Sequence, residues 1–551
     1  MNKFEHGAVG AVVRRLARNA RTISVLLSCC LAIGAIPLVA QSDSSSTSAE
    51  GSESSADIAK ELEQMKARIL HLEAELEAKR TAEASSTVAS DGLGSTTTVP
   101  SVNSLANTTV KTNGQGQSKD SATDKAAPAE PFAYADWTWL NGTARTKDLV
   151  WDSKFFTPEI RFDSNYIMSF NHPRDDTIGG STEIFRSNEV QLEQISFGGD
   201  FHWENVRGRV LTMGGMFAVT TPRNDASTGR GQWDLRGAYR YFSEAYGGYH
   251  FNVNHGLNVD AGIFVSYIGL FSYYNFDNWA YQPSYVSSNT PWFFNGVRIQ
   301  WFPTDKLKIE PWIINGWQSY ARYGSKPGLG GQILWRPKPW VSMVFNNYGM
   351  GRDTLGEGQG SVNRTRLHTD DSIEVKYFDR PEKTIDKMAF SLTGDLGCEY
   401  GAGVSCHGNT SSGPKQSFAG WMLYDRVWFD RDRYAITVGG GAMDNPGRYL
   451  TLLPPINGAD AISGSPYFTA NPGDPFKAWD TSFTFDWMPR QYITFRTEYG
   501  YRHANVPYFT GRGGITPPGG NTGTPSVPVP NWSPDLRKDE PSMRYAILVK
   551  F

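Results

Sequence analysis

The sequence predicts an all-β protein, a transmembrane antiparallel β-barrel of about 16 strands, behind a short helical coiled coil and a flexible linker. Three observations predict it. Residues 131–551 hold nearly all the aromatic residues, in short alternating runs separated by Gly, Pro and Asn. Charged residues recur on one face of these runs. The final run alternates strictly and ends on Phe551.

Residues 1–40 have the composition of a secretory signal peptide. An uncharged apolar run from Thr22 to Ala40 follows several basic residues, and Ala40 is a small residue suited to cleavage. An uncleaved inner-membrane anchor is the alternative, because a run of this length can span a bilayer.

A heptad pattern marks residues 57–80, after a Ser-rich segment at 41–56. Its apolar positions alternate in steps of four and three residues: Ile58, Leu62, Met65, Ile69, Leu72 and Leu76. This narrow stripe predicts a periplasmic coiled coil that makes the protein a homo-oligomer; a single amphipathic helix on another surface is the alternative. Residues 81–130 contain few large apolar residues and are expected to form a flexible linker.

The last run resembles the C-terminal signal by which bacterial outer-membrane barrels are recognised for assembly. Its apolar face includes Tyr545, Ile547, Val549 and Phe551. This interpretation implies the barrel assembly machinery and outer-membrane lipid as partners. The alternative is an ordinary terminal strand of a soluble sandwich.

Turn signals give a consistent topology if the C-terminus is periplasmic, since barrels have short periplasmic turns and long outer loops. Short aromatic-flanked turns are expected at 203–207, 252–257, 301–306, 335–340, 378–381, 429–434 and 487–492. Outer loops are expected at 171–187, 220–232, 265–291, 317–327, 349–363, 398–415, 444–475 and 504–540. Eight outer loops correspond to 16 strands, the first near Pro158–Phe170.

Alternation within the runs 233–241, 478–487 and 491–502 separates an apolar face from a charged one. Membrane barrels turn the apolar face outward, so the charged face is expected to line a water-filled interior. The expected inward cations are Arg161, Arg236, Arg240, Arg298, Lys308, Lys376, Arg496, Arg502, Arg544 and Lys550. The expected inward acids are Asp163, Asp234, Glu310, Glu374, Asp480, Asp486 and Glu498.

Two glycine-punctuated stretches, Gly256–Gly269 and the pair Asn295-Gly296-Val297 with Asn315-Gly316-Trp317-Gln318, resemble the OmpL-like family of outer-membrane β-barrel porins. The resemblance extends in style over most of residues 150–551, through short motifs. It implies an outer-membrane channel for small solutes and names no substrate. The N-terminal coiled coil departs from the simplest members of that family.

The composition of the inner face bears on selectivity. A 16-stranded barrel is wide enough for an aqueous lumen, and strong selectivity needs rings of one sign of charge. The expected inward charges nearly balance, which predicts a weak, slightly anionic preference. For each charged residue, a cross-strand ion pair that holds the wall together is an equal alternative.

The third outer loop, from Ser266 to Pro291, carries eight aromatic residues and one acid, Asp277. So large an apolar surface usually marks a contact. The loop is expected either to fold into the lumen as a constriction or to pack against a neighbouring protomer or the barrel rim; a sugar-stacking track is a weaker third alternative.

Other chemistry has little support. Cys398 and Cys406, eight residues apart in a chain that is expected to be exported, are expected to form a disulfide. Metal-ligand spacing, phosphate loops, cofactor fingerprints and compact catalytic groups are missing from the sequence, so no metal, cofactor or enzymatic activity is expected. A net charge of −3 gives no basic footprint for nucleic acid.

The sequence therefore predicts an outer-membrane porin for passive diffusion of small hydrophilic solutes, with its coiled coil in the periplasm. The alternative is a structural or adhesive barrel protein that links the cell wall to the outer membrane, and peptidoglycan is accordingly a candidate partner.

Overall fold

A computed structural model describes residues 129–174, 176, 178, 185–225, 233–322, 326–349, 364–401, 403–411, 415–446, 476–512 and 535–551. The chain divides into two units, Met1–Ser95 and Thr96–Phe551. Everything described below belongs to the second unit. The expected signal peptide, Ser-rich segment and coiled coil, and the linker up to residue 128, lie outside the described residues.

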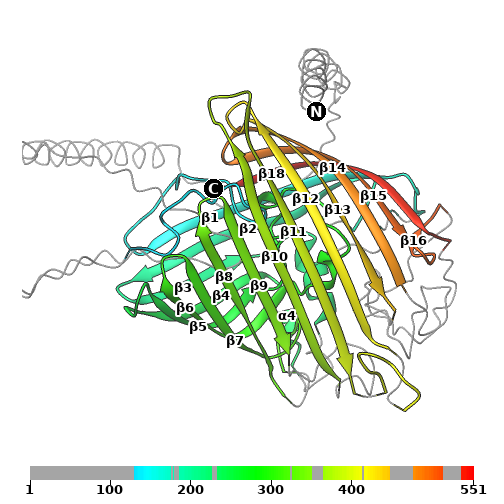
Figure 1. The fold of residues 1–551 in the computed structure, drawn as a ribbon, viewed down its shortest axis with the longest axis horizontal. Helices are drawn as coiled ribbons and strands as arrows, with labels where there is room; N and C mark the ends of the chain where they lie inside the picture. Colours follow the sequence, from blue (N-terminus) through cyan, green and yellow to red (C-terminus); the bar gives the residue numbers. More distant parts are fainter. Residues whose placement is uncertain are drawn as a thin grey trace, which may run out of the picture. The chain divides into compact units, whose positions relative to one another are not determined.

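Sixteen antiparallel strands close into a single barrel (Figure 1). Each strand pairs with its neighbours in sequence, and β1 closes the ring on β18 from Arg161 opposite Lys550 to Ser169 opposite Ser542. The predicted 16-stranded antiparallel barrel is confirmed. The strands are β1 (Phe156–Ser169), β2 (Val190–Trp203), β3 (Val206–Thr212), β4 (Phe242–Phe251), β5 (Leu257–Val265), β6 (Phe293–Thr304), β7 (Leu307–Ile314), β8 (Gly328–Lys338), β9 (Val341–Gly349), β10 (Thr365–Asp379), β11 (Ile385–Tyr400), β12 (Ser417–Phe429), β13 (Tyr434–Asn445), β14 (Phe476–Arg490), β15 (Ile493–Ala504) and β18 (Asp539–Lys550).

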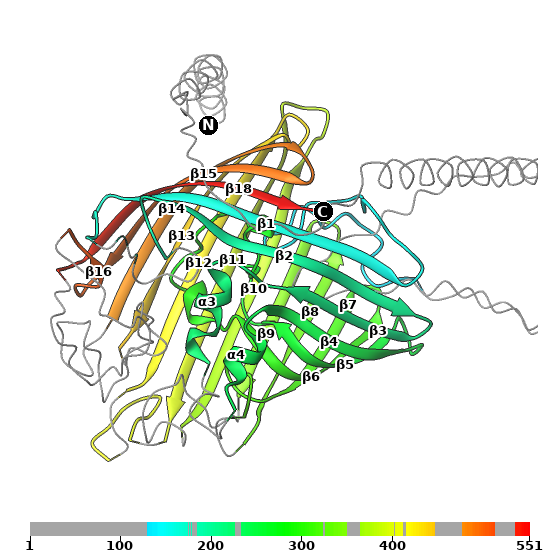
Figure 2. The same cartoon turned by 180° about the vertical axis from the view of Figure 1, so that it is seen from behind.

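The connections alternate between short turns and long loops. The seven expected short turns all fall between consecutive strands, at the end of the barrel where the C-terminus also lies (Figures 1 and 2). We refer to this end as periplasmic, because outer-membrane barrels place their short turns at that end. The segment that precedes β1, drawn in cyan, lies at the same end.

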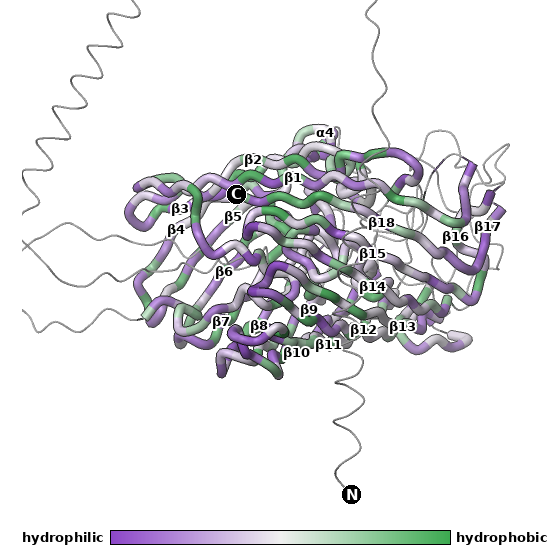
Figure 3. The backbone as a smooth tube through the Cα atoms, turned by 90° about the horizontal axis from the view of Figure 1, so that it is seen from above, coloured by the Kyte–Doolittle hydropathy of each residue, from purple (hydrophilic) through white to green (hydrophobic). Residues whose placement is uncertain are grey.

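Apolar side chains point outward along the strands and polar ones point inward. On β14, Trp479 and Phe483 are 45% and 49% exposed, whereas Thr484 and Asp486 are fully buried. Figure 3 shows the resulting alternation of hydrophobic and hydrophilic residues along the wall. Lipid solvates the outer face in a membrane, so this inverted pattern is stable there and would be costly in water.

The outer loops carry the few remaining elements. The loop between β3 and β4 contains α3, η1 and α4 (Figure 2), and the loop between β5 and β6 contains η3 and η4. A two-stranded sheet of β16 and β17 lies between β15 and β18 in sequence. Their bounds are α3 Phe217–Thr220, η1 Thr221–Asn224, α4 Leu235–Tyr239, η3 Asn275–Asp277, η4 Ser287–Asn289, β16 Phe509–Thr510 and β17 Leu536–Arg537. Across the ranges given above, every helix is too short or too polar to cross a membrane.

One predicted strand is wrong. Residues 233–241 contain α4, and β4 begins only at Phe242. Asp234 caps the helix by accepting a hydrogen bond from the Gly237 amide at 3.0 Å. Leu235 and Tyr239 pack on the apolar cluster around Tyr320. These two residues are four apart, so their pattern fits one helical face as well as it fits a strand.

Candidate functional site: the barrel lumen

A segment before the first strand crosses the periplasmic mouth of the barrel. We call residues 131–147 the luminal strap. Trp137 and Trp139 of the strap are at most 1% exposed and join the main apolar cluster inside the barrel. The Arg336 guanidinium on β8 lies over the rings of Phe132 and Trp137, at 4.9 and 4.8 Å. These contacts fix the strap as part of the lumen.

The strap spans the full width of the ring. At its start the Phe132 amide donates to the Asp305 carbonyl, 2.7 Å away in the β6–β7 turn. Near its end Arg145 donates to the Arg490 carbonyl at 2.8 Å and to the Ile493 carbonyl, at the β14–β15 turn. Eight strands separate these turns in either direction around the barrel, so the strap lies across a diameter.

The strap meets the third outer loop in the middle of the lumen. We call residues 266–292 loop L3. The Asn141 amide donates to Glu374 Oε1 on β10 at 2.7 Å, and its side-chain oxygen accepts from the Trp279 amide of L3 at 2.9 Å. Gly142 has a φ of 69°, and a Cβ there would overlap the Leu270 carbonyl oxygen of L3. Only glycine fits this junction without displacement.

L3 folds into the lumen, as one of the sequence-based alternatives proposed. The described side chains from Tyr267 to Pro291 are nearly all buried. Tyr281 and Trp279 of this loop are 0% and 3% exposed. Packing of this loop against a neighbouring protomer is not what the structure shows.

Three predicted inward acids hold L3 through its hydrogen-bond donors. Asp163 accepts from the Tyr281 hydroxyl at 3.0 Å and from the Asn275 side chain at 2.8 Å. Glu498 accepts from the backbone amides of residues 281 and 282 at 2.6 and 3.0 Å. Asp480 accepts from the Ser284 hydroxyl and the Tyr285 amide at 2.7 and 2.9 Å. The wall thus presents acceptors where the loop presents donors.

Three predicted inward arginines hold the same loop through its acceptors. Arg161 donates to both oxygens of Asp277 at 3.1 Å. Arg496 donates to the carbonyls of residues 275 and 278 at 3.2 and 2.6 Å. Arg502 donates to the Pro283 carbonyl at 3.0 Å. A loop carbonyl inside a crowded lumen would otherwise be a costly unpaired group.

The other predicted pore residues serve the wall itself. Arg298 is paired with Asp260 at 2.9 Å and lies over the rings of Tyr246 and Phe264. Glu310 pairs with Lys308 and accepts from Trp312 Nε1 at 2.9 Å. Asp486 is bound by Arg496 and Arg426, each at 2.7 Å. The Arg298–Asp260 and Arg496–Asp486 pairs join neighbouring strands, as the alternative role predicted, whereas Lys308 and Glu310 lie on the same strand.

Two predicted pore residues are misplaced. Arg236 and Arg240 were assigned to an inward strand face, but they lie in and after α4 in an outer loop. Both are only partly buried, and Arg240 donates to the Tyr241 hydroxyl beside it at 2.7 Å. The acid assigned to the same face, Asp234, is the helix cap described above.

The expected water-filled interior also needs correction. Arg298, Lys308, Asp486 and Glu498 are fully buried rather than solvated. L3 covers Glu498, and salt bridges and hydrogen bonds satisfy the four charges in place of water.

Space does remain at the periplasmic mouth. A cavity of about 510 Å³, which we call the vestibule, is bordered by the strap and by the β12–β13 and β14–β15 turns. It adjoins a smaller cavity of about 20 Å³, since both are lined by Thr138, Arg145, Trp428 and Met488. The smaller cavity also borders L3 at Phe276–Trp279. We call it the constriction; its volume accommodates about one water molecule.

The charges at this mouth are fixed by their surroundings. Burial lowers the pKa of Arg145 to about 9, which leaves its guanidinium positive at neutral pH. Burial would raise the pKa of Asp136, but hydrogen bonds from Lys147 and Thr138 bring it down to about 2. Deeper in the lumen, burial raises the pKa of Tyr281 well above its usual range and keeps the phenol neutral.

The sequence analysis missed the strap. It assigned residues 131–551 to the barrel as one block and recognised no luminal role for the segment before the first strand. The available signal was the cluster Phe132, Trp137 and Trp139 directly after a linker without aromatic residues, followed by the turn dipeptide Asn141-Gly142.

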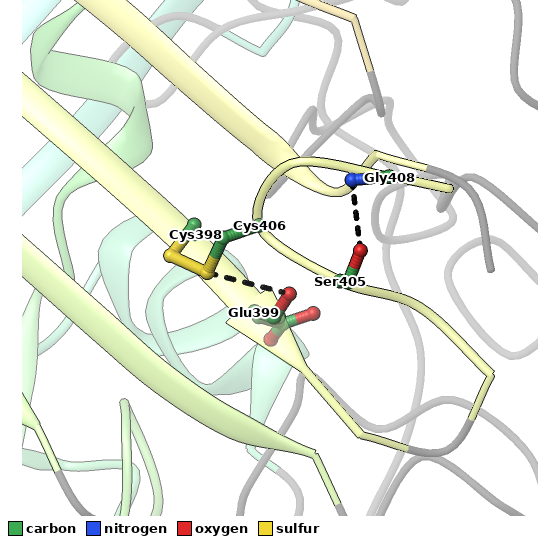
Figure 4. Close-up of a disulfide and its surroundings, with 5 residues drawn as sticks. All are labelled: Cys398, Glu399, Ser405, Cys406 and Gly408. Atoms are coloured by element: carbon green, nitrogen blue, oxygen red, sulfur yellow. Dashed lines mark hydrogen bonds between the residues drawn. A yellow bond between two sulfur atoms is a disulfide. The ribbon is translucent and has the colours of Figure 1, made fainter. Parts of the chain in front are cut away.

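Cys398 and Cys406 are joined by a disulfide at the outer end of β11 (Figure 4). Cys398 lies on the strand itself rather than in the loop where the sequence analysis put it, and Cys406 lies in the loop that follows. The Gly408 amide donates to Ser405 Oγ at 2.8 Å and tightens the same turn. Within the described part of the chain, no three His, Cys, Asp or Glu side chains cluster as a metal site would require.

Solved structures that resemble the chain include the trimer form of OmpT from Vibrio cholerae (TM-score 0.40, 9% identity, 73% of this chain and 100% of that one). The outer-membrane channel DcaP of Acinetobacter baumannii gives a TM-score of 0.39 at 11% identity, over 72% and 96% of the two chains. The anion-selective porin from Comamonas acidovorans gives 0.38 at 9% identity, over 72% and 99%. Among curated proteins, none matches.

The family is given by a sequence comparison. Residues 162–524, which span β1 to the segment after β15, match the family described as "Putative beta-barrel porin-2, OmpL-like". This range is about two thirds of the chain and contains nearly all the barrel wall. The chain therefore belongs to the OmpL-like family of β-barrel porins, and it is a porin of the outer membrane.

Proposed function

We propose that the protein carries small hydrophilic solutes by passive diffusion along a path that runs from the vestibule past the strap and L3. The observation that carries this proposal is the vestibule itself, an open polar cavity of about 510 Å³ that leads to the constriction inside a closed barrel. Along this path, passage of anything larger than water requires the constriction to widen, because its volume is about 20 Å³.

The strap is the element best placed to widen this path. It is attached to the wall at Phe132, Asn141 and Arg145 and to L3 at Asn141, whereas L3 is held along most of its length by charged wall residues. Displacing the strap would leave these charged contacts of L3 in place. We propose that the porin conducts when the strap leaves its position across the periplasmic mouth, which we call its seat.

The crowded lumen also favours a second candidate, a structural barrel whose lumen is plugged and which links the cell wall to the outer membrane. In this function the chain before the strap would bind peptidoglycan. Under either candidate we propose insertion by the barrel assembly machinery, a periplasmic coiled coil at residues 57–80 that joins protomers, and no enzymatic activity.

Single-channel recording in planar bilayers separates the two candidates. The passive porin predicts conductance steps from purified, folded protein, with larger or longer openings once the strap is unseated by Gly142→Ala. Heat-modifiable mobility on a gel checks that the native protein and this variant are both folded. If neither folded protein gives conductance steps, the structural role is supported and the passive porin is contradicted.

A further inference from the structure

The vestibule is strongly cationic. Six basic side chains line it, against two acidic ones. The basic residues are Arg145, Lys147, Lys387, Arg431, Arg433 and Arg490, and the acidic residues are Asp430 and Asp432. The positive and negative charges of the inner face as a whole were expected to be nearly equal in number. The excess of positive charge is therefore local to the periplasmic mouth.

Ion pairs neutralise only part of the excess. Asp432 pairs with Lys387 at 2.8 Å, and Asp430 pairs with Arg433 at 3.0 Å. Lys147 pairs with Asp136, also of the strap, at 2.6 Å. The first two pairs use both acids that line the vestibule, and the third uses an acid outside its lining.

Three guanidinium groups remain without an acidic partner among the described residues. Arg145 donates to the backbone carbonyls of residues 490 and 493 and to Thr494 Oγ1, which carry no net charge. Arg431 and Arg490 are exposed at the two turns that form the vestibule rim. A guanidinium group binds carboxylate and phosphate through paired N–H donors, so three of them around one cavity favour anions.

The backbone of one turn is shaped to present such a group. Asp430, Arg431 and Asp432 have φ values of 53°, 56° and 61°, all in the left-handed region. Aspartate tolerates this region, whereas arginine occupies it at a cost. The turn is held by the Asp432 amide, which donates to Asp386 Oδ2 at 2.7 Å, and by the Asp430 amide, which donates to the Thr384 carbonyl at 3.2 Å. Backbone strain retained in a turn often accompanies a function.

The positive lining continues inward from the vestibule. Arg426 and Arg496 border the constriction together with Arg145, against two acids, Asp486 and Asp277. Asp486 pairs with Arg426 and Arg496, and Asp277 pairs with Arg161 of the wall. The Nε of Arg426 has no hydrogen-bond partner within the resolved ranges, although its residue is 4% exposed. An anion that enters the vestibule therefore meets further donors along the path to L3.

We propose that the vestibule is a binding site for small anions with two or more carboxylate or phosphate groups. Its volume of about 510 Å³ lies within the range of small-molecule sites, about 300–1,000 Å³. Arg431 and Arg490 at the rim capture the anion, and Arg145 holds it at the entrance of the constriction. The proposed site identifies the class of solute that the porin would carry. Only the passage step rests on the proposed function, because anion binding itself needs no conduction.

The binding step is tested on the full chain in detergent by isothermal titration calorimetry, with citrate and inorganic pyrophosphate as probes. The test variant is Arg431→Gln with Arg490→Gln. The matched control is Lys338→Gln with Arg380→Gln, which removes the same charge from exposed residues at periplasmic turns that do not line the vestibule. We expect the test variant to weaken binding by about tenfold or more, as loss of a charge-assisted contact implies, and the control by less than about twofold.

The two probes distinguish the anionic groups. Tighter binding of citrate assigns carboxylate solutes to the site, and tighter binding of pyrophosphate assigns phosphorylated ones. Absence of binding for both, or an equal loss in the test and control variants, overturns the proposal, because the effect would then reflect net charge rather than the vestibule.

The passage step is tested by reversal potentials in a salt gradient and by block of chloride current. Citrate added on the vestibule side should block at lower concentration than citrate on the opposite side, and the test variant should remove this asymmetry. Conductance without anion binding overturns this inference alone, whereas binding without conductance overturns the passive porin alone.

Discussion

Replacing Gly142 with alanine adds one methyl group at the junction of the strap and L3. The residue has a φ of 69°, and the new Cβ would overlap the Leu270 carbonyl oxygen and lie 3.1 Å from the Ser272 amide nitrogen. Both opposing atoms belong to the backbone of L3, which the wall holds through several charged contacts. The strap, rather than the loop, is therefore expected to move.

The magnitude follows from two costs. A non-glycine residue in the left-handed region costs about 1–2 kcal/mol, and overpacking a filled interior costs about 1–3 kcal/mol. The bound position of the strap is stabilised by about 1.5–3 kcal/mol for each large apolar side chain that is buried there. Each of the two hydrogen bonds of Asn141 adds about 1 kcal/mol. Losing about 2 kcal/mol, the lower limit of the penalty, raises the population of the unseated strap about 30-fold.

Single-channel recording measures this shift directly, as open probability or step size, and hydrogen exchange at residues 137–145 reports the seat itself. The matched control is Gly394→Ala on β11, where an added Cβ meets nothing within 4 Å. We expect faster exchange and increased conductance for Gly142→Ala and no change for the control. If exchange accelerates but conductance stays at the native level, the strap does not limit the path and the reasoning is wrong.

Three further predictions concern assembly and stability. Deletion of Phe551, which stacks on Tyr492 at 5.6 Å and pairs through its backbone with Ile160, should lower the amount of protein inserted in the outer membrane, as seen by membrane fractionation; native amounts would contradict the assembly signal. Mass spectrometry without reductant should find Cys398 and Cys406 oxidised, and replacing both with serine should destabilise the sixth outer loop by no more than about 3 kcal/mol; two free thiols would refute the pairing. Changing Ile69 and Leu76 to lysine should reduce cross-linked oligomer while the barrel stays folded, because a short seam cannot bury charge; an unchanged oligomer would show that other contacts join the protomers.

The barrel was predictable because its signals are local and repeated. The period-two alternation of Trp479, Phe483 and Trp487 and the aromatic-flanked turns fixed strand number and direction without any long-range information. The pattern failed at 233–241, where Leu235 and Tyr239 fit a helical period equally well and Asp234 supplies a helix cap. Five helical residues are too few for periodicity alone to decide.

The lumen was harder to predict than the wall. Alternation identified Asp163, Arg496 and Glu498 as inward residues, but it could not tell water from protein as their partner, since either satisfies a charge. The choice depends on where L3 and the strap lie, and these segments have no period. Trp137 and Trp139 lie beneath the cationic groups of Arg336 and Lys376, roughly 200 positions away in sequence.

The position of the strap also has a mechanical consequence. Because the strap precedes β1, any tension on the chain before residue 129 reaches Phe132 and Trp137 before it reaches the barrel. The attachment points lie one after another along the strap, at Phe132, Asn141 and Arg145, so tension loads them in turn, as in peeling, rather than together, as in shear. We expect optical-tweezer pulling on the N-terminal side to release the strap in small steps at a force well below that which unravels the wall. A load borne in the periplasm would then be converted into a wider passage through the membrane.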